Sequence, residues 1–241
     1  MFEGKMKAVT FSYDDGVTQD LRIISMFEKY GLRGTFNLNS GLLGNKDTLT
    51  RCSVTVSHEK IPANEIRRVY SGHEVAVHTL THPKLTLIED DSLIIRQVEE
   101  DRLRLSELCG YEVVGMAYPG GNPNHDDRVV DLIKNHTGIK YARVYDSNFS
   151  FDIQADLFRF HSTCQDINHY AKMLELAEEF VEMKPDKPQI FYIWGHSYTY
   201  DIWPEKWKLF DRFLSTIAGK NDIFYGTNSE VLLRAQKINK D

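Results

Sequence analysis

The sequence predicts an α/β fold in which short buried strands alternate with longer helices. Seven runs rich in Val, Ile, Phe and Tyr have the near-continuous apolar character of strands buried on both faces of a parallel sheet. Alternation of strands with helices indicates βα units with right-handed crossovers. The predicted strands are 7–13, 34–39, 73–79, 113–119, 140–144, 189–196 and 222–228.

The helices are predicted from apolar periodicity and from residues that favour helix ends. Thr18 is the expected N-cap of a helix that runs to about Tyr30, and Gly31 follows it. Further helices are predicted at 89–109, 126–136, 167–183, 204–218 and 229–237. The segment 40–72 is less regular, and we expect it to hold an excursion with a short extra strand, CSVTVS.

Two closures of the sheet fit this pattern, an open doubly wound sheet and a barrel. No GxGxxG loop follows the first strand, so the dinucleotide-binding form of the open sheet has no support. Polar residues at the strand ends, described below, favour an irregular α/β barrel. The 241 residues, 41% of them apolar, suffice for one sizeable core, and a single domain over 1–241 is expected.

Composition excludes several classes of function. The formal net charge of −6 and the lack of Lys/Arg runs argue against nucleic acid and membrane surfaces as partners. No apolar run reaches 18 residues, and MFEGKMKAVTF lacks the apolar region of a secretory signal, so a cytoplasmic location is expected, with a trimmed secreted chain as the alternative. Cys52, Cys109 and Cys164 form no CxxC pair and are expected to be small apolar fillers. No motif predicts the oligomeric state.

Reactive side chains follow four of the predicted strands. Asp14 and Asp15 end the first strand, and His78 ends the third. Tyr-Pro-Gly-Gly (118–121) ends the fourth strand, and Trp-Gly-His (194–196) ends the sixth. In a parallel α/β barrel the carboxyl ends of the strands form the rim on which active sites are built. The four coincidences together predict one site at that rim.

The segment HTLTH (78–82) has the spacing of a metal-binding pair. On a helix, HxxxH with glutamate after the first histidine is the zinc-protease motif, but Thr79 stands there and Pro83 disfavours a helix at His82. We therefore expect a turn with both rings facing inward, although this spacing alone is also common in pairs with only a structural role. Two histidines and a strand-end aspartate would leave open positions on a catalytic Zn²⁺ or similar ion.

Four segments resemble one known family. FSYDDG, HTLTH, AYPGG and IWGHS follow, in order, the motifs of the polysaccharide deacetylases of carbohydrate esterase family 4, also called the NodB-homology domain. The resemblance extends from the first to the sixth predicted strand. It implies a distorted, TIM-like (β/α)7 barrel, a divalent metal and hydrolysis of acetyl groups from an acetylated oligo- or polysaccharide.

The resemblance also implies a metal-ligand set. Asp15, His78 and His82 occupy the positions of the three ligands. Zn²⁺ is the expected ion, with Co²⁺, Ni²⁺ and Mn²⁺ as alternatives. His73 is the best other candidate ligand, but it is expected at the start of its strand and on the opposite face.

The catalytic roles follow from the same resemblance. Asp14 corresponds to the general base, His196 to the general acid, and the backbone N–H of Gly120 faces the developing oxyanion. Because no acyl-enzyme is needed, the lack of a GxSxG motif is no objection. Tyr118, Pro119, Trp194 and Arg143 are the expected substrate contacts.

One departure from the family pattern concerns the base. The family's third motif usually begins with an arginine that orients the base aspartate, but Ala117 stands there. Arg143, near the end of the fifth predicted strand, is the candidate replacement. The fourth motif is indistinct, and Asp146 or Asp152 are weak candidates to support the acid histidine.

The aromatic residues near the sixth predicted strand and the function itself each fit more than one interpretation. Tyr198, Tyr200, Trp203 and Trp207 form an aromatic group with Trp194 that fits either a sugar platform or core packing. The function also has two alternatives to carbohydrate deacetylation, a metal-dependent amidase or deformylase acting on a small amide and an inactive carbohydrate-binding protein. The retained acid–base pair argues against the inactive protein.

Overall fold

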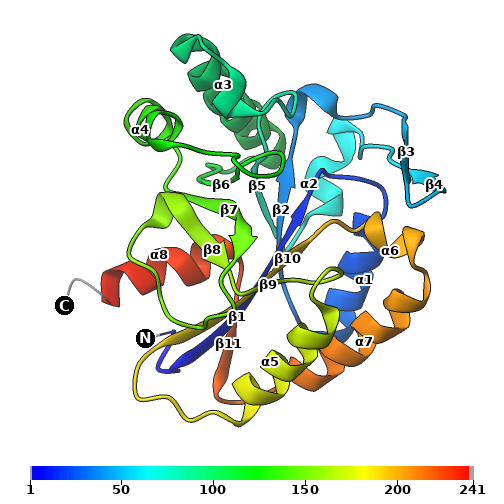
Figure 1. Ribbon diagram of the computed structural model, residues 1–241, viewed down its shortest axis with the longest axis vertical. Coiled ribbons are helices and arrows are strands. Elements are labelled where there is room, and N and C mark those ends of the chain that lie inside the picture. Colours follow the sequence, from blue (N-terminus) through cyan, green and yellow to red (C-terminus); the bar gives the residue numbers. More distant parts are fainter. Residues whose placement is uncertain (1, 239–241) are drawn as a thin grey trace.

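The computed structural model describes residues 2–238 and shows a nearly closed parallel barrel surrounded by helices (Figure 1). All neighbouring strands in this sheet pair in parallel, in the order β8-β7-β6-β5-β2-β1-β10-β9. The strands are β1 (Lys7–Asp14), β2 (Thr35–Leu38), β5 (Glu74–Val77), β6 (Gly115–Ala117), β7 (Tyr141–Ser147), β8 (Phe160–Ser162), β9 (Cys164–Gln165), β10 (Gln189–Gly195) and β11 (Ile223–Tyr225).

The barrel closes where β8 passes into β9. Only Thr163 separates these strands; β8 pairs with β7 and β9 pairs with β10. The amide of Thr163 also donates to the carbonyl of Tyr192 in β10, 2.8 Å away. If β8 and β9 are counted as one interrupted strand, seven strands form the barrel, which confirms the predicted distorted (β/α)7 fold.

The set of seven strands differs from the predicted set in one place. The predicted run 222–228 forms the short β11, which pairs only with the beginning of β1 and lies off the barrel path. Its place in the barrel is taken by residues 160–165, for which the sequence pattern predicts no strand. This segment, FHSTCQ, lacks the continuous apolar run that marks the other strands, so its pattern does not predict a strand.

Most helices fall where their periodicity predicts them. Asp90 and Asp126 act as side-chain N-caps of the two helices that follow them, and such caps contribute about 1 kcal/mol each. Thr18 is not the N-cap of the first helix; Gln19 holds that position and makes no side-chain capping bond, while the backbone amide of Thr18 donates to the carbonyl of Glu59. The helices are α1 (Asp20–Tyr30), α2 (Ile66–Val69), α3 (Asp91–Cys109), α4 (Asp127–His136), α5 (Tyr170–Glu182), α6 (Thr199–Ile202), α7 (Glu205–Ile217) and α8 (Asn228–Ile238), with 3₁₀ turns η1 (Ser40–Leu42), η2 (Ala63–Glu65), η3 (Leu85–Leu87) and η4 (Leu157–Arg159).

The irregular segment between β2 and β5 contains an antiparallel hairpin that stands apart from the barrel sheet (Figure 1). It consists of β3 (Thr48–Arg51) and β4 (Val54–Ser57), so the expected extra strand is present and has a partner. Cys52 lies exposed in its turn and is therefore not an apolar filler, whereas Cys109 and Cys164 are buried. After the hairpin, Lys60 pairs with Val17 beside the end of β1.

Alternation along β1 determines which side chains face the barrel interior. Val9, Phe11 and Tyr13 belong to the large core between the sheet and the helices. The residues between them, from Ala8 to Asp14, point to the other face because successive strand side chains alternate. Ser12 there accepts a hydrogen bond from Asn37 of β2, 2.8 Å away. Asp14 thus lies inside the barrel at its carboxyl end. Among the described residues, no helix is both long and apolar enough to cross a membrane.

Candidate active site

Asp14 is held by two polar side chains inside the barrel. One carboxylate oxygen, Oδ2, lies 2.6 Å from Nη2 of Arg143, and the other accepts a hydrogen bond from Nδ2 of Asn37 at 2.8 Å. Burial opposes ionisation, but Arg143 and then the neighbouring histidines outweigh it, so the pKa of Asp14 lies below its ordinary value. Arg143 therefore meets the carboxylate of Asp14 from β7, in place of the side chain that Ala117 lacks.

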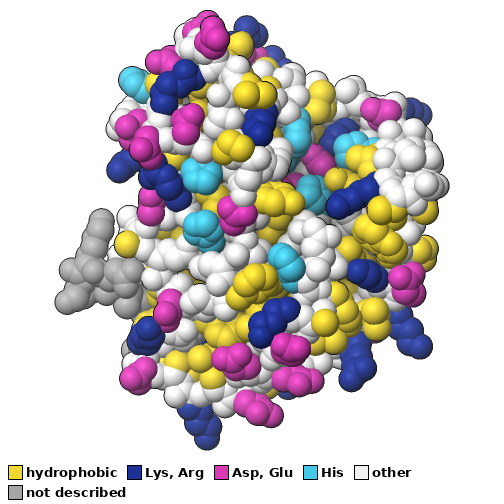
Figure 2. Space-filling view, viewed as in Figure 1, with side chains coloured by type: hydrophobic (Ala, Val, Ile, Leu, Met, Phe, Trp, Pro, Cys, Tyr) yellow, Lys and Arg dark blue, Asp and Glu magenta, His cyan; other side chains and the backbone are white. Residues whose placement is uncertain are grey.

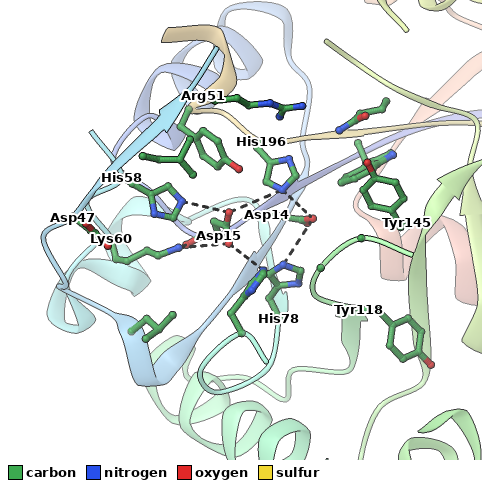
Figure 3. Close-up of a pocket in the computed structure, with 18 of the residues that line it drawn as sticks. Asp14, Asp15, Asp47, Arg51, His58, Lys60, His78, Tyr118, Tyr145 and His196 are labelled. Carbon is green, nitrogen blue, oxygen red and sulfur yellow. Dashed lines mark hydrogen bonds and ion pairs between the residues drawn. The ribbon is translucent and has the colours of Figure 1, made fainter. Parts of the chain in front are cut away.

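Asp15 and the two histidines of HTLTH converge beside Asp14 (Figure 3). Ligand atoms of Asp15, His78 and His82 all lie within 4.8 Å of one another. The HTLTH segment forms a turn, with positive φ angles at Thr79 and His82 and a bond from the amide of His82 to Oγ1 of Thr79. This turn replaces the helix of the zinc-protease motif.

The ring of His78 is oriented by a backbone group. Its Nδ1 lies 2.8 Å from the carbonyl oxygen of Ala117, which favours a proton on Nδ1 and leaves Nε2 free toward Asp14 and Asp15. Burial lowers the pKa of His78 to about 4, so the neutral ring is the dominant form at neutral pH. A neutral imidazole with a free nitrogen is the form that binds a metal ion. Ala117 thus contributes its carbonyl to the site where the family pattern has an arginine side chain.

Two further residues beside Asp15 have no sequence motif that predicts them. Nζ of Lys60 donates to the backbone carbonyl of Asp15 at 2.7 Å and lies 3.5 Å from its Oδ1. Nε2 of His58 lies 3.5 Å from Oδ2. Although burial opposes ionisation, His58 and Lys60 hold the pKa of Asp15 well below its ordinary range. Asp15 has a φ of 84°, a strained backbone conformation for aspartate, and Lys60 holds its carbonyl there. Both residues come from the irregular segment, where no motif marks them.

His196 lies on the opposite side of the two carboxylates from His78 (Figure 3). Its Nε2 is 3.9 Å from Oδ2 of Asp14 and 4.0 Å from Oδ2 of Asp15. Burial lowers the pKa of His196, while the two carboxylates oppose that shift. Asp146 and Asp152 do not support it: Asp146 bonds to Asn122, and Asp152 pairs with Lys187.

Asp20 supports the segment that follows His196. It is fully buried and accepts hydrogen bonds from Oγ of Ser197 at 2.6 Å and from the hydroxyl of Tyr70 at 2.8 Å. Burial raises the pKa of Asp20 to about 7, against these two bonds. The carboxylate at the start of α1 thus fixes the residue next to His196, a link that sequence spacing cannot reveal.

The site opens into a cavity of about 480 Å³. Histidine side chains appear around this hollow in the space-filling view (Figure 2). Of the expected substrate contacts, Tyr118, Arg143 and Trp194 line it, as does Gly120, whereas Pro119 is not among the described lining residues. The hydroxyl of Tyr118 is already used, donating to the carbonyl of Phe158 at 3.1 Å.

The structure divides the aromatic group near the end of β10. Trp194 and Tyr198 line the cavity. Tyr200 and Trp207 stack on each other in the core, with ring centroids 4.5 Å apart, and Trp203 packs half-buried beside them. His73 lies away from the site, where its Nδ1 accepts from the amide of Gly34.

Asp166 forms a second buried carboxylate cluster next to the site. Its Oδ2 accepts hydrogen bonds from the hydroxyls of Tyr13 and Tyr200, at 2.9 and 2.7 Å. The carboxylate also packs against Gly195, where any Cβ would clash with it. Burial raises the pKa of Asp166 to about 6 despite these bonds. It stands between the predicted strand 140–144 and the predicted helix 167–183, where the sequence pattern indicates no regular element.

This raised pKa predicts a pH-dependent stability difference. Between about pH 4 and 6 the folded protein holds the Asp166 proton more tightly than the unfolded chain, so about 3 kcal/mol of stability is lost as pH rises through that window. In Asp166→Asn this loss should disappear. We expect urea unfolding at pH 4.5 and 7 to show a flatter stability profile for Asp166→Asn than for wild type or the exposed control Asp131→Asn. Parallel profiles would show that Asp166 does not titrate in this range.

Comparison with known proteins identifies the family. The family model for polysaccharide deacetylases matches residues 3–142, more than half of the chain. The chain belongs to the polysaccharide deacetylase family. This confirms the resemblance inferred from the four motifs. No curated protein sequence matches the chain.

Solved structures of the same fold come from several bacteria. A family 4 carbohydrate esterase from Streptomyces lividans, in complex with acetate, is 14% identical, with a TM-score of 0.57 and coverage of 94% of both chains. Peptidoglycan deacetylase PdaC from Bacillus subtilis is 16% identical, with a TM-score of 0.55 over 98% of this chain and 94% of that chain. A CE4 family pseudoenzyme from Bacillus anthracis is 15% identical, with a TM-score of 0.56 over 95% of this chain and 66% of that chain. At these identities the likeness concerns the fold.

Proposed function

We propose that this deacetylase hydrolyses an acetyl group from an N- or O-acetylated carbohydrate and depends on a divalent metal. The observation that carries the proposal is the position of Asp14 and His196, which flank the Asp15, His78 and His82 cluster at one cavity. A carbohydrate-binding protein would need neither a proton acceptor nor a proton donor there.

The donor set fits a divalent ion. One carboxylate and two imidazoles suit Zn²⁺, and also Co²⁺, Ni²⁺ or Mn²⁺, and three protein ligands leave positions for water and substrate. The bond from Nδ1 of His78 to the carbonyl of Ala117 orients that ring, as hydrogen bonds to the free nitrogen of a metal-ligating histidine do. When bound, such an ion polarises a carbonyl group and lowers the pKa of water.

Asp14 serves in this proposal as the general base. Its pKa is low, so it is ionised at neutral pH, and Arg143 and Asn37 fix its two oxygens. From this position it accepts the proton of the water that attacks the acetyl carbonyl. Burial of the Arg143–Asp14 pair keeps the carboxylate from rotating away from the cavity.

His196 serves as the general acid, and Gly120 stabilises the oxyanion. His196 donates a proton to the leaving nitrogen or oxygen of the carbohydrate as the carbon–oxygen or carbon–nitrogen bond breaks. Because its pKa is lowered, the protonated ring is a strong proton donor. The backbone N–H of Gly120, which lines the same cavity, would donate to the oxyanion.

Acetate release tests the function directly. The protein, loaded with Zn²⁺, would be incubated with acetylated xylan, chitooligosaccharides, peptidoglycan fragments and small N-acetyl and N-formyl amides. We expect acetate from at least one carbohydrate and little product from the small amides. Formate or acetate from the amides alone would favour the amidase alternative, and no product from any substrate would favour an inactive binding protein.

A further inference from the structure

The face of the β3–β4 hairpin toward the cavity carries a positively charged side chain. Leu49 and Arg51, two residues apart on β3, both line the cavity. Thr50, between them, points to the other face and bonds to Thr55 across the hairpin. The pairing register thus presents Arg51 to the cavity. Figure 3 shows Arg51 on the side of His196 and away from His78.

Arg51 differs from the other cations of the cavity in lacking an acidic partner. Lys60 pairs with Asp15, and Arg143 pairs with Asp14. No carboxylate of residues 2–238 forms an ion pair or hydrogen bond with Arg51; its guanidinium lies 5.9 Å from the ring centre of Trp203. A cation with no bound carboxylate therefore stands at the cavity wall.

The unused polar atoms of the cavity are mainly donors. Nε1 of Trp194 and both Nε and Nη1 of Arg143 are buried and lack a hydrogen-bond partner within the described structure, as does Nε2 of His58. Indole and guanidinium nitrogens can only donate. These atoms are shielded from the cavity, so Arg51, which is exposed, is the arginine or lysine of the lining that stays accessible to an acceptor group.

The charge balance points the same way. Three acidic and three basic side chains line the cavity, so their formal charges cancel, although the chain as a whole carries −6. A divalent ion on Asp15, His78 and His82 makes the cavity net positive. The charged lining residues are Asp14, Asp15, Asp47, Arg51, Lys60 and Arg143.

We propose that the substrate carries a carboxylate on its leaving-group portion and that Arg51 binds this carboxylate. This inference rests on the proposed function, because it places the acetylated atom at the catalytic carboxylates. Because His196 is the proposed proton donor to the leaving group, the leaving-group portion of the substrate would lie on the His196 side of the cavity. Tyr198 lies on the same side, with its ring centroid 5.2 Å from that of His196. Arg51 lies on that same side of the cavity (Figure 3). A guanidinium matches the two oxygens of a carboxylate.

Matched acid and ester substrates test this specificity. The panel pairs an N-acetylhexosamine oxidised to the uronic acid with its methyl ester, and an N-acetylhexosamine lactyl ether acid with its methyl ester. For at least one pair we expect kcat/KM to be about tenfold or more higher for the acid, as one charge-assisted hydrogen bond would give. In Arg51→Met this preference should fall to about one while turnover of the ester is kept. Arg22→Met, which removes an exposed arginine stacked on Trp207, is the control and should keep the preference.

Binding of the deacetylated products separates this inference from the proposed function. Calorimetry of the Zn²⁺-loaded wild type should show tighter binding of the acid product than of its ester, and Arg51→Met should remove the difference. A preference that persists in Arg51→Met would place the carboxylate elsewhere, on the metal for example, and would overturn the assignment. Equal binding of acid and ester, or equal kcat/KM with acetate still released, would overturn it while leaving deacetylation intact. Acid-selective binding with no acetate release would instead contradict the proposed function alone.

Discussion

Asp14→Asn is expected to lose about 10³-fold or more in kcat while still binding a divalent ion. The substitution removes the proposed proton acceptor and leaves Asp15, His78 and His82 unchanged. General-base catalysis contributes typically about 10²–10⁴-fold, which sets the size of the expected loss. Single-turnover acetate release and metal content of the same preparation would be measured together. A kcat within tenfold of wild type would exclude Asp14 as the base.

The structural cost of this substitution must be separated from its catalytic cost. Arg143 is fully buried and pairs with Asp14 at 2.6 Å, and removing one partner of a buried ion pair costs about 3–5 kcal/mol. The amide oxygen of asparagine can keep one hydrogen bond to Arg143, so we expect a smaller loss in the free energy of unfolding. Circular dichroism during urea titration would measure it.

The double variant Asp14→Asn/Arg143→Met provides the control. It removes both charges of the pair, so the buried guanidinium no longer lacks its anion, and part of the lost stability should return. Turnover should stay low because no base is restored. Return of activity with stability would show that Asp14 acts only as the structural partner of Arg143.

The strand-end motifs predicted the site because they depend on local chemistry and on one rule of topology. Asp14, Asp15, His78 and His196 all follow buried strands, and in a parallel barrel these ends meet at one rim. The fold followed from the alternation of apolar runs with helices. The one barrel strand that was not predicted, residues 160–165, is short and polar, and it is a strand only because β7 and β10 pair with it on either side.

The supporting residues could not be predicted in the same way. Lys60 and His58 reach Asp15 through the path of the hairpin segment, and the carbonyl of Ala117 has no side-chain signature at all. Asp20 and Asp166 are buried carboxylates whose partners lie 50 or more and 34 or more residues away along the chain. Such contacts are set by tertiary packing, and spacing along one sequence carries no trace of them.

His82→Ala is expected to remove the divalent ion from the protein, and it is the sharpest test of the metal site. His82 supplies one of three protein ligands, with its Nε2 3.7 Å from Oδ1 of Asp15. Its side chain is about a third exposed, at 36%, whereas His78 is buried and bonded to Ala117, so loss of His82 should disturb folding less. We expect about one ion per chain in the wild type and at least about a 100-fold weaker affinity in the variant, because loss of a residue that only hydrogen-bonds to a ligand already costs about 10–100-fold.

Chelator competition with Zn²⁺ and Co²⁺ would measure that affinity, and the Co²⁺ absorption spectrum would report the ligand set independently of turnover. His125→Ala is the matched control, since His125 stacks on Tyr118 near the same rim but is not part of the cluster. The control should bind the ion as wild type does. Unchanged affinity in His82→Ala would show that His82 is not a ligand of the ion. His58, whose Nε2 lies 3.5 Å from Oδ2 of Asp15, would then be the next residue to substitute. If the wild-type chain binds neither ion, the metal site is contradicted. The carboxylate of Asp15 would then interact with Lys60 and His58 alone, and hydrolysis would have to proceed without a Lewis acid at this site.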